Sequence, residues 1–221
     1  MIGVAESREK VGTWLGWIAS TALGWAVGFA YTMPTTVASV SHLVRLVPLL
    51  VANGALVGFV SGIGQGAILR KRGCRINSWP WVSALGHSIA VCVGLAIAFV
   101  VPWLAFRARG VALLGEGSGY SFNPTPAYLV LGAFVIGTTQ WPVLRHHLPM
   151  QGARRAALWI VGAWAAIGLA VLLGGLVRGL VMDAIASTAL RGILERALAG
   201  SLAGIGSGGV LLILLKPRDS H

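Results

Sequence analysis

The hydrophobic positions of this chain fall into six long stretches, separated by short segments rich in arginine, glycine and proline. None of the six stretches contains Asp or Glu, and their apolar residues run continuously instead of alternating with polar ones. A membrane-spanning helix needs about 20 such residues, whereas a barrel strand places a lumen-facing residue at every second position. The pattern therefore predicts one all-α transmembrane domain over residues 1–221. The predicted spans are residues 11–31, 46–69, 81–106, 127–144, 156–177 and 197–215.

Residues 179–196, between the last two spans, have a different pattern. Charged residues such as Asp183 and Glu195 alternate there with leucine, isoleucine and valine, and Arg191 and Glu195 are spaced for an i, i+4 pair. This pattern predicts an amphipathic helix that either lies at the outer membrane interface or extends the last span.

The composition supports a membrane protein and excludes several other classes. Hydrophobic residues make up 56% of the 221 residues and charged residues 10%. A soluble domain carries about 25% charged residues, so soluble enzymes and disordered chains are excluded. The net charge of +11 does not indicate nucleic-acid binding, because the basic residues are scattered among short loops. Cys74 and Cys92 are too few for a disulfide framework and are expected to be free thiols.

The distribution of lysine and arginine predicts the orientation. If the N-terminus is cytoplasmic, 11 of the 17 basic residues lie on the cytoplasmic side, mostly in short loops. The remaining six are Arg45, Arg107, Arg109, Arg178, Arg191 and Arg196. Cytoplasmic loops carry an excess of positive charge, so we expect both termini in the cytoplasm. Helical spans of this kind favour a bacterial cytoplasmic membrane.

The even-numbered spans contain an internal repeat. Shifting residues 58–70 by 75 places Gly62, Gln65, Leu69 and Arg70 on Gly137, Gln140, Leu144 and Arg145. Shifting them by 142 places Gly58, Gly62 and Gly66 on Gly200, Gly204 and Gly208, with Ser207 in the position of Gln65. The odd-numbered spans share a tryptophan followed by small residues, beginning at Trp17, Trp81 and Trp159. Three tandem hairpins of equal orientation are therefore expected, packed as a six-helix bundle with approximate threefold symmetry.

The element Gly137, Gln140, Trp141, Leu144 and Arg145 resembles one that recurs in a family of uncharacterised bacterial polytopic membrane proteins, written G-x-x-Q-W-x-x-L-R. The copy that begins at Gly62 departs from it, because Gly66 replaces the tryptophan, and the third copy lacks both glutamine and arginine. The resemblance extends over most of the chain. It implies a shared architecture and no established activity.

Gln65, Gln140 and Ser207 form a predicted polar level inside the membrane. Each glutamine precedes an interfacial arginine by five residues and therefore lies about 7.5 Å deeper in a helix. A polar side chain at that depth needs a partner, because lipid offers none. Two interpretations remain open, namely hydrogen bonds between helices and a polar ring that lines a cavity.

Two sets of glycines are predicted to serve helix packing. Small residues spaced by four place the backbones of two membrane helices in close contact. The six glycines are Gly58, Gly62, Gly66, Gly200, Gly204 and Gly208. A hinge or a contact between substrate and backbone is the alternative.

Few residues of the sequence are candidates for binding a cofactor or lipid. His87 is the only histidine within a predicted span and is a weak candidate for ligating a chlorophyll-type pigment or haem, because no second ligand lies at i+3 or i+4. Bound lipid is expected at an inner basic rim. The rim consists of Arg70, Arg72, Arg145, Arg154 and Arg155. No metal site is predicted.

The expected function follows from residues and motifs that the sequence lacks. The spans contain no acidic residue for a proton or sodium relay, and the chain has no nucleotide-binding or hydrolase motif. We therefore expect a non-catalytic membrane subunit or accessory protein that packs against lipid and other membrane proteins. A channel or facilitator for a small solute, through the Gln65 level, is the alternative. A pigment- or haem-associated membrane subunit is a further alternative.

Overall fold

The structure is a computed structural model that describes residues 2–28, 40–108, 125–147, 153–181 and 188–215. These residues form six α-helices and no strand, so the all-α prediction is confirmed. The helices are α1 (Ile2–Gly28), α2 (Val40–Lys71), α3 (Trp79–Ala108), α4 (Thr125–His147), α5 (Ala153–Val181) and α6 (Thr188–Leu214). The described part of each predicted span coincides with a separate helix.

Four of the helices contain a stretch that is long and apolar enough to cross a membrane. These stretches are Arg45–Lys71, Trp79–Ile97, Ala153–Ala170 and Leu190–Leu214. They lie in α2, α3, α5 and α6. The described parts of α1 and α4 contain no such stretch. The apolar stretch of α1 is interrupted by Thr21 and by several tryptophans and glycines. The side chains of α4 are described only over residues 131–147, which is shorter than any of the four stretches.

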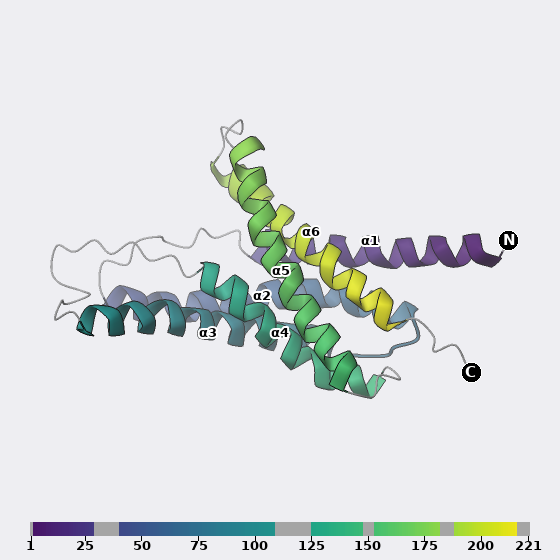
Figure 1. The fold of residues 1–221 in the computed structure, drawn as a ribbon, viewed down its shortest axis with the longest axis horizontal. Coiled ribbons are helices and arrows are strands. Elements are labelled where there is room, and N and C mark those ends of the chain that lie inside the picture. The colour runs from purple at the N-terminus through teal and green to yellow at the C-terminus, as the bar shows by residue number, and fades with distance from the viewer. Residues whose placement is uncertain (1, 29–39, 109–124, 148–152, 182–187, 216–221) are drawn as a thin grey trace.

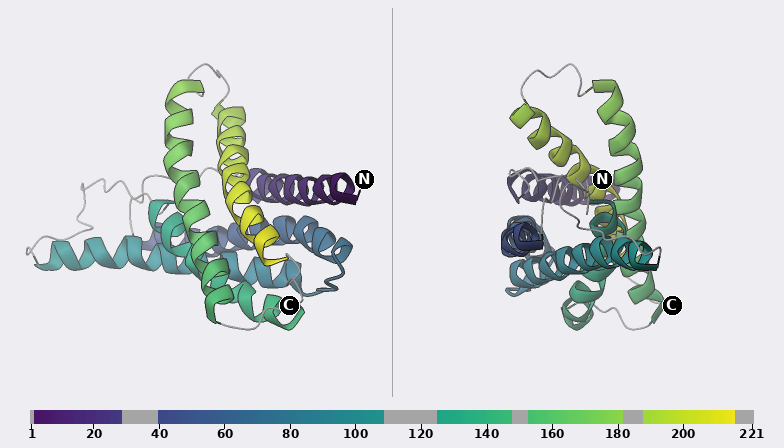
Figure 2. Two further views of the ribbon diagram at one scale, coloured as in Figure 1. Left: turned by 45° about the vertical axis from the view of Figure 1, so that its right-hand side comes forward. Right: turned by 90° about the vertical axis from the view of Figure 1, so that its left-hand side faces the viewer.

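The helices form a closed ring. Each helix contacts its neighbours in sequence, and α6 packs extensively against α1, which closes the circle. The contact between α4 and α5 is the least extensive of the six. The helices do not share one tilt, because α5 and α6 are steeply inclined to α1, α2 and α3 in Figures 1 and 2. The first residues of α1, the turn between α2 and α3, and the end of α6 lie at one end of the ring (Figure 1).

Local backbone geometry explains where α2 ends. Gly73 has a positive φ of 82°, a conformation that glycine adopts without steric cost. Its N–H donates to Arg70 O at 3.0 Å, and the N–H of Cys74 donates to Leu69 O at 2.9 Å. These two bonds form a Schellman motif, which satisfies the last carbonyls of the helix. The chain can then turn within a few residues and begin α3 at Trp79.

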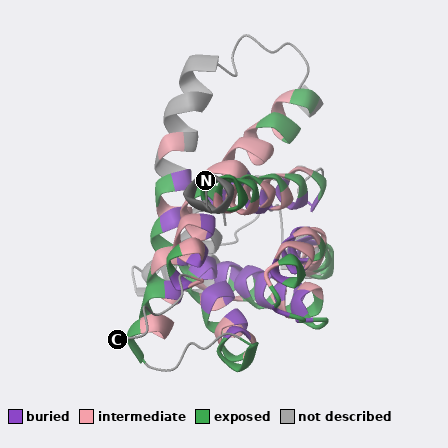
Figure 3. Cartoon of the chain, turned by 90° about the vertical axis from the view of Figure 1, so that its right-hand side faces the viewer, coloured by how far each residue is buried: buried purple, intermediate pink, exposed green. Residues whose placement is uncertain are grey.

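The burial pattern differs from that of a soluble protein in two respects. The buried residues include polar ones, namely Thr21, Asn53, Ser61, Gln65, Ser83, His87 and Gln140. Large apolar side chains are exposed on every helix, for example Leu15, Ile63, Leu85, Phe134, Trp164 and Ile213. Figure 3 shows the same division, with buried residues mainly where the helices face one another. Such an arrangement suits an apolar solvent around the ring.

Two buried apolar clusters fill the ring. The first contains Trp17, Leu69, Cys74, Ile76, Trp79, Leu144, Trp159, Leu211 and Leu214. The second contains Trp25, Leu50, Val57, Ala90, Val91, Leu95 and Ile136. Because Leu69 follows Gln65 by four residues and Trp25 follows Thr21 by four, the clusters flank the predicted polar level along the helices on opposite sides.

The segment 179–196 does not form a separate helix among the described residues. Gly179–Val181 end α5, residues 182–187 lie outside the described residues, and Thr188–Arg196 begin α6. Residues 188–196 therefore extend the last span, which is one of the two predicted arrangements of this segment. Cys74 and Cys92 are both free, as expected.

Candidate functional site

The predicted polar level lines a cavity inside the ring. The cavity has a volume of about 50 Å³, and its lining includes Gln65, Gln140 and Ser207. All six helices contribute to it. The other lining residues are Trp17, Thr21, Trp25, Ser61, His87, Ala133, Ile136, Trp159, Ala163, Ile167 and Ala203. The structure thus brings the three predicted residues to one site.

Gln65 is the centre of a hydrogen-bond chain that connects three helices. Trp79 Nε1 on α3 donates to Gln65 Oε1 at 3.1 Å, and Gln65 Nε2 donates to Thr21 Oγ1 on α1 at 3.1 Å. Thr21 Oγ1 in turn donates to Trp17 O at 2.9 Å. Each of these side chains is buried. The chain of bonds satisfies the polar groups that lipid would leave without a partner.

The two other members of the level also bond to neighbouring helices, and Gln140 makes fewer bonds than Gln65. Gln140 Nε2 on α4 donates to Ser83 Oγ on α3 at 3.1 Å. Ser207 Oγ on α6 accepts from Trp17 Nε1 on α1 at 3.1 Å and donates to Ala203 O at 2.8 Å. Both open interpretations of the level therefore have structural support, because these residues connect helices and also line a cavity.

Two buried polar atoms of the lining have no hydrogen-bond partner among the described residues. They are Ser61 Oγ on α2 and Trp159 Nε1 on α5. Their side chains are 2% and 1% exposed. A buried donor without a partner costs about 1–3 kcal/mol, so such atoms in a native fold call for an explanation.

Three tryptophans pack together at one side of the cavity. Trp17, Trp79 and Trp159 have ring centroids between 6.2 and 6.5 Å apart, in tilted and edge-on arrangements. These distances are favourable for aromatic pairs. The tryptophan predicted to lead the third span, Trp81, is instead 67% exposed and contacts Phe59 on the outside.

The sequence contains a signal for this aromatic cluster that the prediction missed. A small residue follows each tryptophan of this cluster by four positions, as Thr21, Ser83 and Ala163. Residues four apart share one helix face, so this spacing distinguishes Trp79 from Trp81.

His87 lies in the same site. It is buried, lines the cavity, and its Nδ1 lies 2.8 Å from Ser83 O. A carbonyl oxygen only accepts, so Nδ1 carries the proton and, in a neutral ring, Nε2 is the acceptor. A ligand pocket usually has about 300–1,000 Å³. The cavity beside His87 is several times smaller and does not fit a porphyrin or chlorophyll ring.

The predicted packing glycines lie at helix crossings inside the ring. A Cβ on Gly58 would lie 2.8 Å from Ala84 Cα, and one on Gly62 would lie 2.7 Å from Pro80 Cα. On α6, a Cβ on Gly200 would lie 2.9 Å from Ala22 Cα, and one on Gly204 would lie 2.8 Å from Ile18 Cα.

The third glycine of each set has more room. A Cβ on Gly208 would lie 3.0 Å from Trp14 Cδ1, and one on Gly66 would make ordinary contacts with Trp79. The first set therefore packs α2 on α3, and the second packs α6 on α1.

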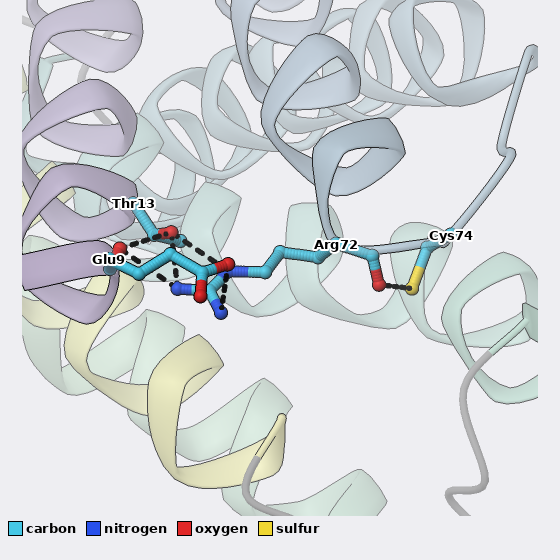
Figure 4. Close-up of polar contacts among 4 residues, drawn as sticks. All are labelled: Glu9, Thr13, Arg72 and Cys74. Atoms are coloured by element: carbon cyan, nitrogen blue, oxygen red, sulfur yellow. Dashed lines mark hydrogen bonds and ion pairs between the residues drawn. The ribbon is translucent and has the colours of Figure 1, made fainter. Parts of the chain in front are cut away.

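One arginine of the predicted basic rim is held by specific contacts. Arg72 Nη1 lies 2.9 Å from Glu9 Oε1, and Arg72 also donates to Glu9 O and to Thr13 Oγ1, as Figure 4 shows. These contacts attach the polar start of α1 to the end of α2. The other rim residues are Arg70, Arg145 and Arg154, which are exposed, and Arg155, which is half-buried.

The described residues contain no candidate metal cluster. No group of three or more histidine, cysteine, aspartate or glutamate side chains comes together in the described part of the chain. Burial raises the pKa of the Cys74 thiol, which lies in the turn after α2 and donates weakly to Arg72 O. A raised pKa lowers the thiolate fraction and makes this cysteine a poor nucleophile.

Comparisons with protein-family models, with curated proteins and with solved structures find no match for this chain. The resemblance of its G-x-x-Q-W-x-x-L-R element to a membrane-protein family therefore stays a prediction.

Proposed function

We propose that this chain is a non-catalytic integral membrane subunit, whose six helices cross the membrane as three tandem hairpins and pack against lipid and other membrane proteins. Both termini are cytoplasmic in this proposal, and the membrane is a bacterial inner membrane. The observation that carries it is the distribution of polarity, since buried glutamine, serine and histidine face the ring interior and large apolar side chains face outward.

The exposed surfaces of α1 and α4 support six crossings. Leu15 is 54% exposed on α1, and Phe134 is 52% exposed on α4. Both helices also belong to the ring, between helices that contain candidate spans. A polar interior lowers the average hydropathy of such a helix, while its outer face stays apolar enough for lipid.

The burial of matched positions supports the internal repeat. Leu69, Leu144 and Leu211 are all fully buried and belong to one cluster. Gly62 and Gly204 both lie against the backbone of a neighbouring helix, and a Cβ on Gly137 would lie 3.1 Å from Ile160 Cα. The copies are therefore similar in their contacts as well as in their residues.

Packing on other proteins would use the outer apolar surface, because the glycine faces are occupied within the chain. Native purification in a mild detergent, followed by native mass spectrometry, tests this proposal. We expect the chain to co-purify in fixed stoichiometry with at least one other membrane protein and with bound phospholipid. Recovery of a monodisperse, isolated monomer from several mild detergents would contradict the subunit role.

A facilitator for a small solute is a second candidate, which the cavity favours. The cavity lies between two apolar clusters, so passage would require them to separate. In proteoliposomes, Gln140→Leu is expected to abolish solute flux while the protein stays folded. Thr138→Val is the matched control, because Thr138 is exposed on the same helix. Equal flux in both variants, or flux no greater than that of empty liposomes, would exclude this candidate.

A further inference from the structure

We propose that the central cavity binds an uncharged polar solute of a few non-hydrogen atoms, and that the indole N–H of Trp159 and the hydroxyl of Ser61 recognise it. This site goes beyond the proposed role as a membrane subunit, and it does not depend on partner proteins or on solute flux.

Trp159 differs from the two tryptophans packed against it. Of the three clustered tryptophans, Trp79 donates its indole N–H to Gln65, and Trp17 donates its own to Ser207. Trp159 lines the cavity and has no partner for this group among the described residues. Ser61 Oγ on α2, which packs against Gly24 of α1, also has no partner among the described residues. A solute that accepts from Trp159 and bonds to Ser61 would satisfy both groups.

The volume limits the size of this solute. A cavity needs about 10–15 Å³ of probe-occupied volume to hold one water molecule. The observed volume of about 50 Å³ therefore has room for a few waters, or for one compact molecule such as formamide or urea.

The lining limits the charge and the bonding pattern of the solute. Within the described part of the chain, no Asp, Glu, Lys or Arg lines the cavity. An ion there would lose its hydration without a counter-charge, which is costly. Trp159 requires an acceptor, Ser61 can donate or accept, and Nε2 of a neutral His87 would require a donor. Water and primary amides both combine an acceptor with a donor.

The experiment observes the tryptophan indoles directly. Protein carrying ¹⁵N-labelled tryptophan is placed in nanodiscs of phosphatidylethanolamine and phosphatidylglycerol, and its indole N–H signals are recorded by NMR. Trp159→Phe identifies the signal of interest. Trp164→Phe is the matched control, because Trp164 is on the same helix but 44% exposed. One arm measures magnetisation transfer from water, and a second arm titrates formamide and urea.

We expect the Trp159 indole to show a saturable shift with formamide or urea that the Trp17 and Trp79 indoles do not show. Transfer from water without a saturable shift would identify resident water alone and would overturn the proposal. Ser61→Ala should raise the apparent Kd about fivefold to tenfold, because one hydrogen bond is lost. A Trp159 signal without water transfer and without a saturable shift would show a dry void and overturn the proposal.

Discussion

Replacing Gly204 with leucine is expected to lower the thermal midpoint of the detergent-solubilised protein by about 2–12 °C. Gly204 lies where α6 crosses α1, and a Cβ there would lie 2.8 Å from Ile18 Cα. Backbone atoms cannot move aside as a flexible side chain can, so the two helices must separate. Overpacking of this kind costs about 1–3 kcal/mol, and each kcal/mol shifts the midpoint of a chain this long by about 2–4 °C.

Gly209→Leu is the matched control for this substitution. It lies on the same helix, and a Cβ at Gly209 would meet no atom within 4 Å. We expect its midpoint to stay within about 2 °C of the wild-type value, since substitutions away from packed sites usually change stability by less than about 0.5 kcal/mol. Midpoints from circular dichroism or differential scanning fluorimetry check both values. A folded Gly204→Leu protein with an unchanged midpoint would contradict the packing role.

The sequence predicts the helices well because its apolar stretches are long. The described part of each predicted span lies in one helix, except for Leu215, which follows α6. The helices α1, α2 and α6 begin several residues before their spans. The polar residues at the start of α1 do not stop the helix, and Arg72 holds them against α2 through Glu9 and Thr13. Such a tertiary contact leaves no periodic pattern in the sequence.

The candidate site is predicted only in part. Aligning the repeats correctly selects Gln65, Gln140 and Ser207, which line one cavity. The same alignment does not reveal that Trp159 lacks the partner that Trp79 has in Gln65. That difference depends on how each helix pair crosses, and α5 contacts α4 less extensively than α3 contacts α2. Equivalent hairpins would share one tilt, but α5 and α6 are steeply inclined to the first three helices (Figure 2).

Replacing Gln65 with leucine is expected to lower the free energy of unfolding by about 2–3 kcal/mol. Gln65 accepts from Trp79 Nε1 and donates to Thr21 Oγ1, and all three side chains are buried. Leucine would leave the indole N–H of Trp79 without a partner, and a buried unsatisfied donor alone costs about 1–3 kcal/mol. Gln140→Leu should cost less, about 1 kcal/mol, because its side chain makes one bond, to Ser83.

A double-mutant cycle separates this bond from a general loss of packing. In the Gln65→Leu protein, Trp79→Phe should cost at least about 1 kcal/mol less than in the wild type, because the indole N–H no longer has a partner to lose. Trp164→Phe, on the outer surface, should show no such coupling with Gln65→Leu. Reversible unfolding in mixed detergent measures the four free energies of each cycle. Equal costs of Trp79→Phe in both backgrounds would mean that the bond contributes nothing, and that leucine acts through its shape alone.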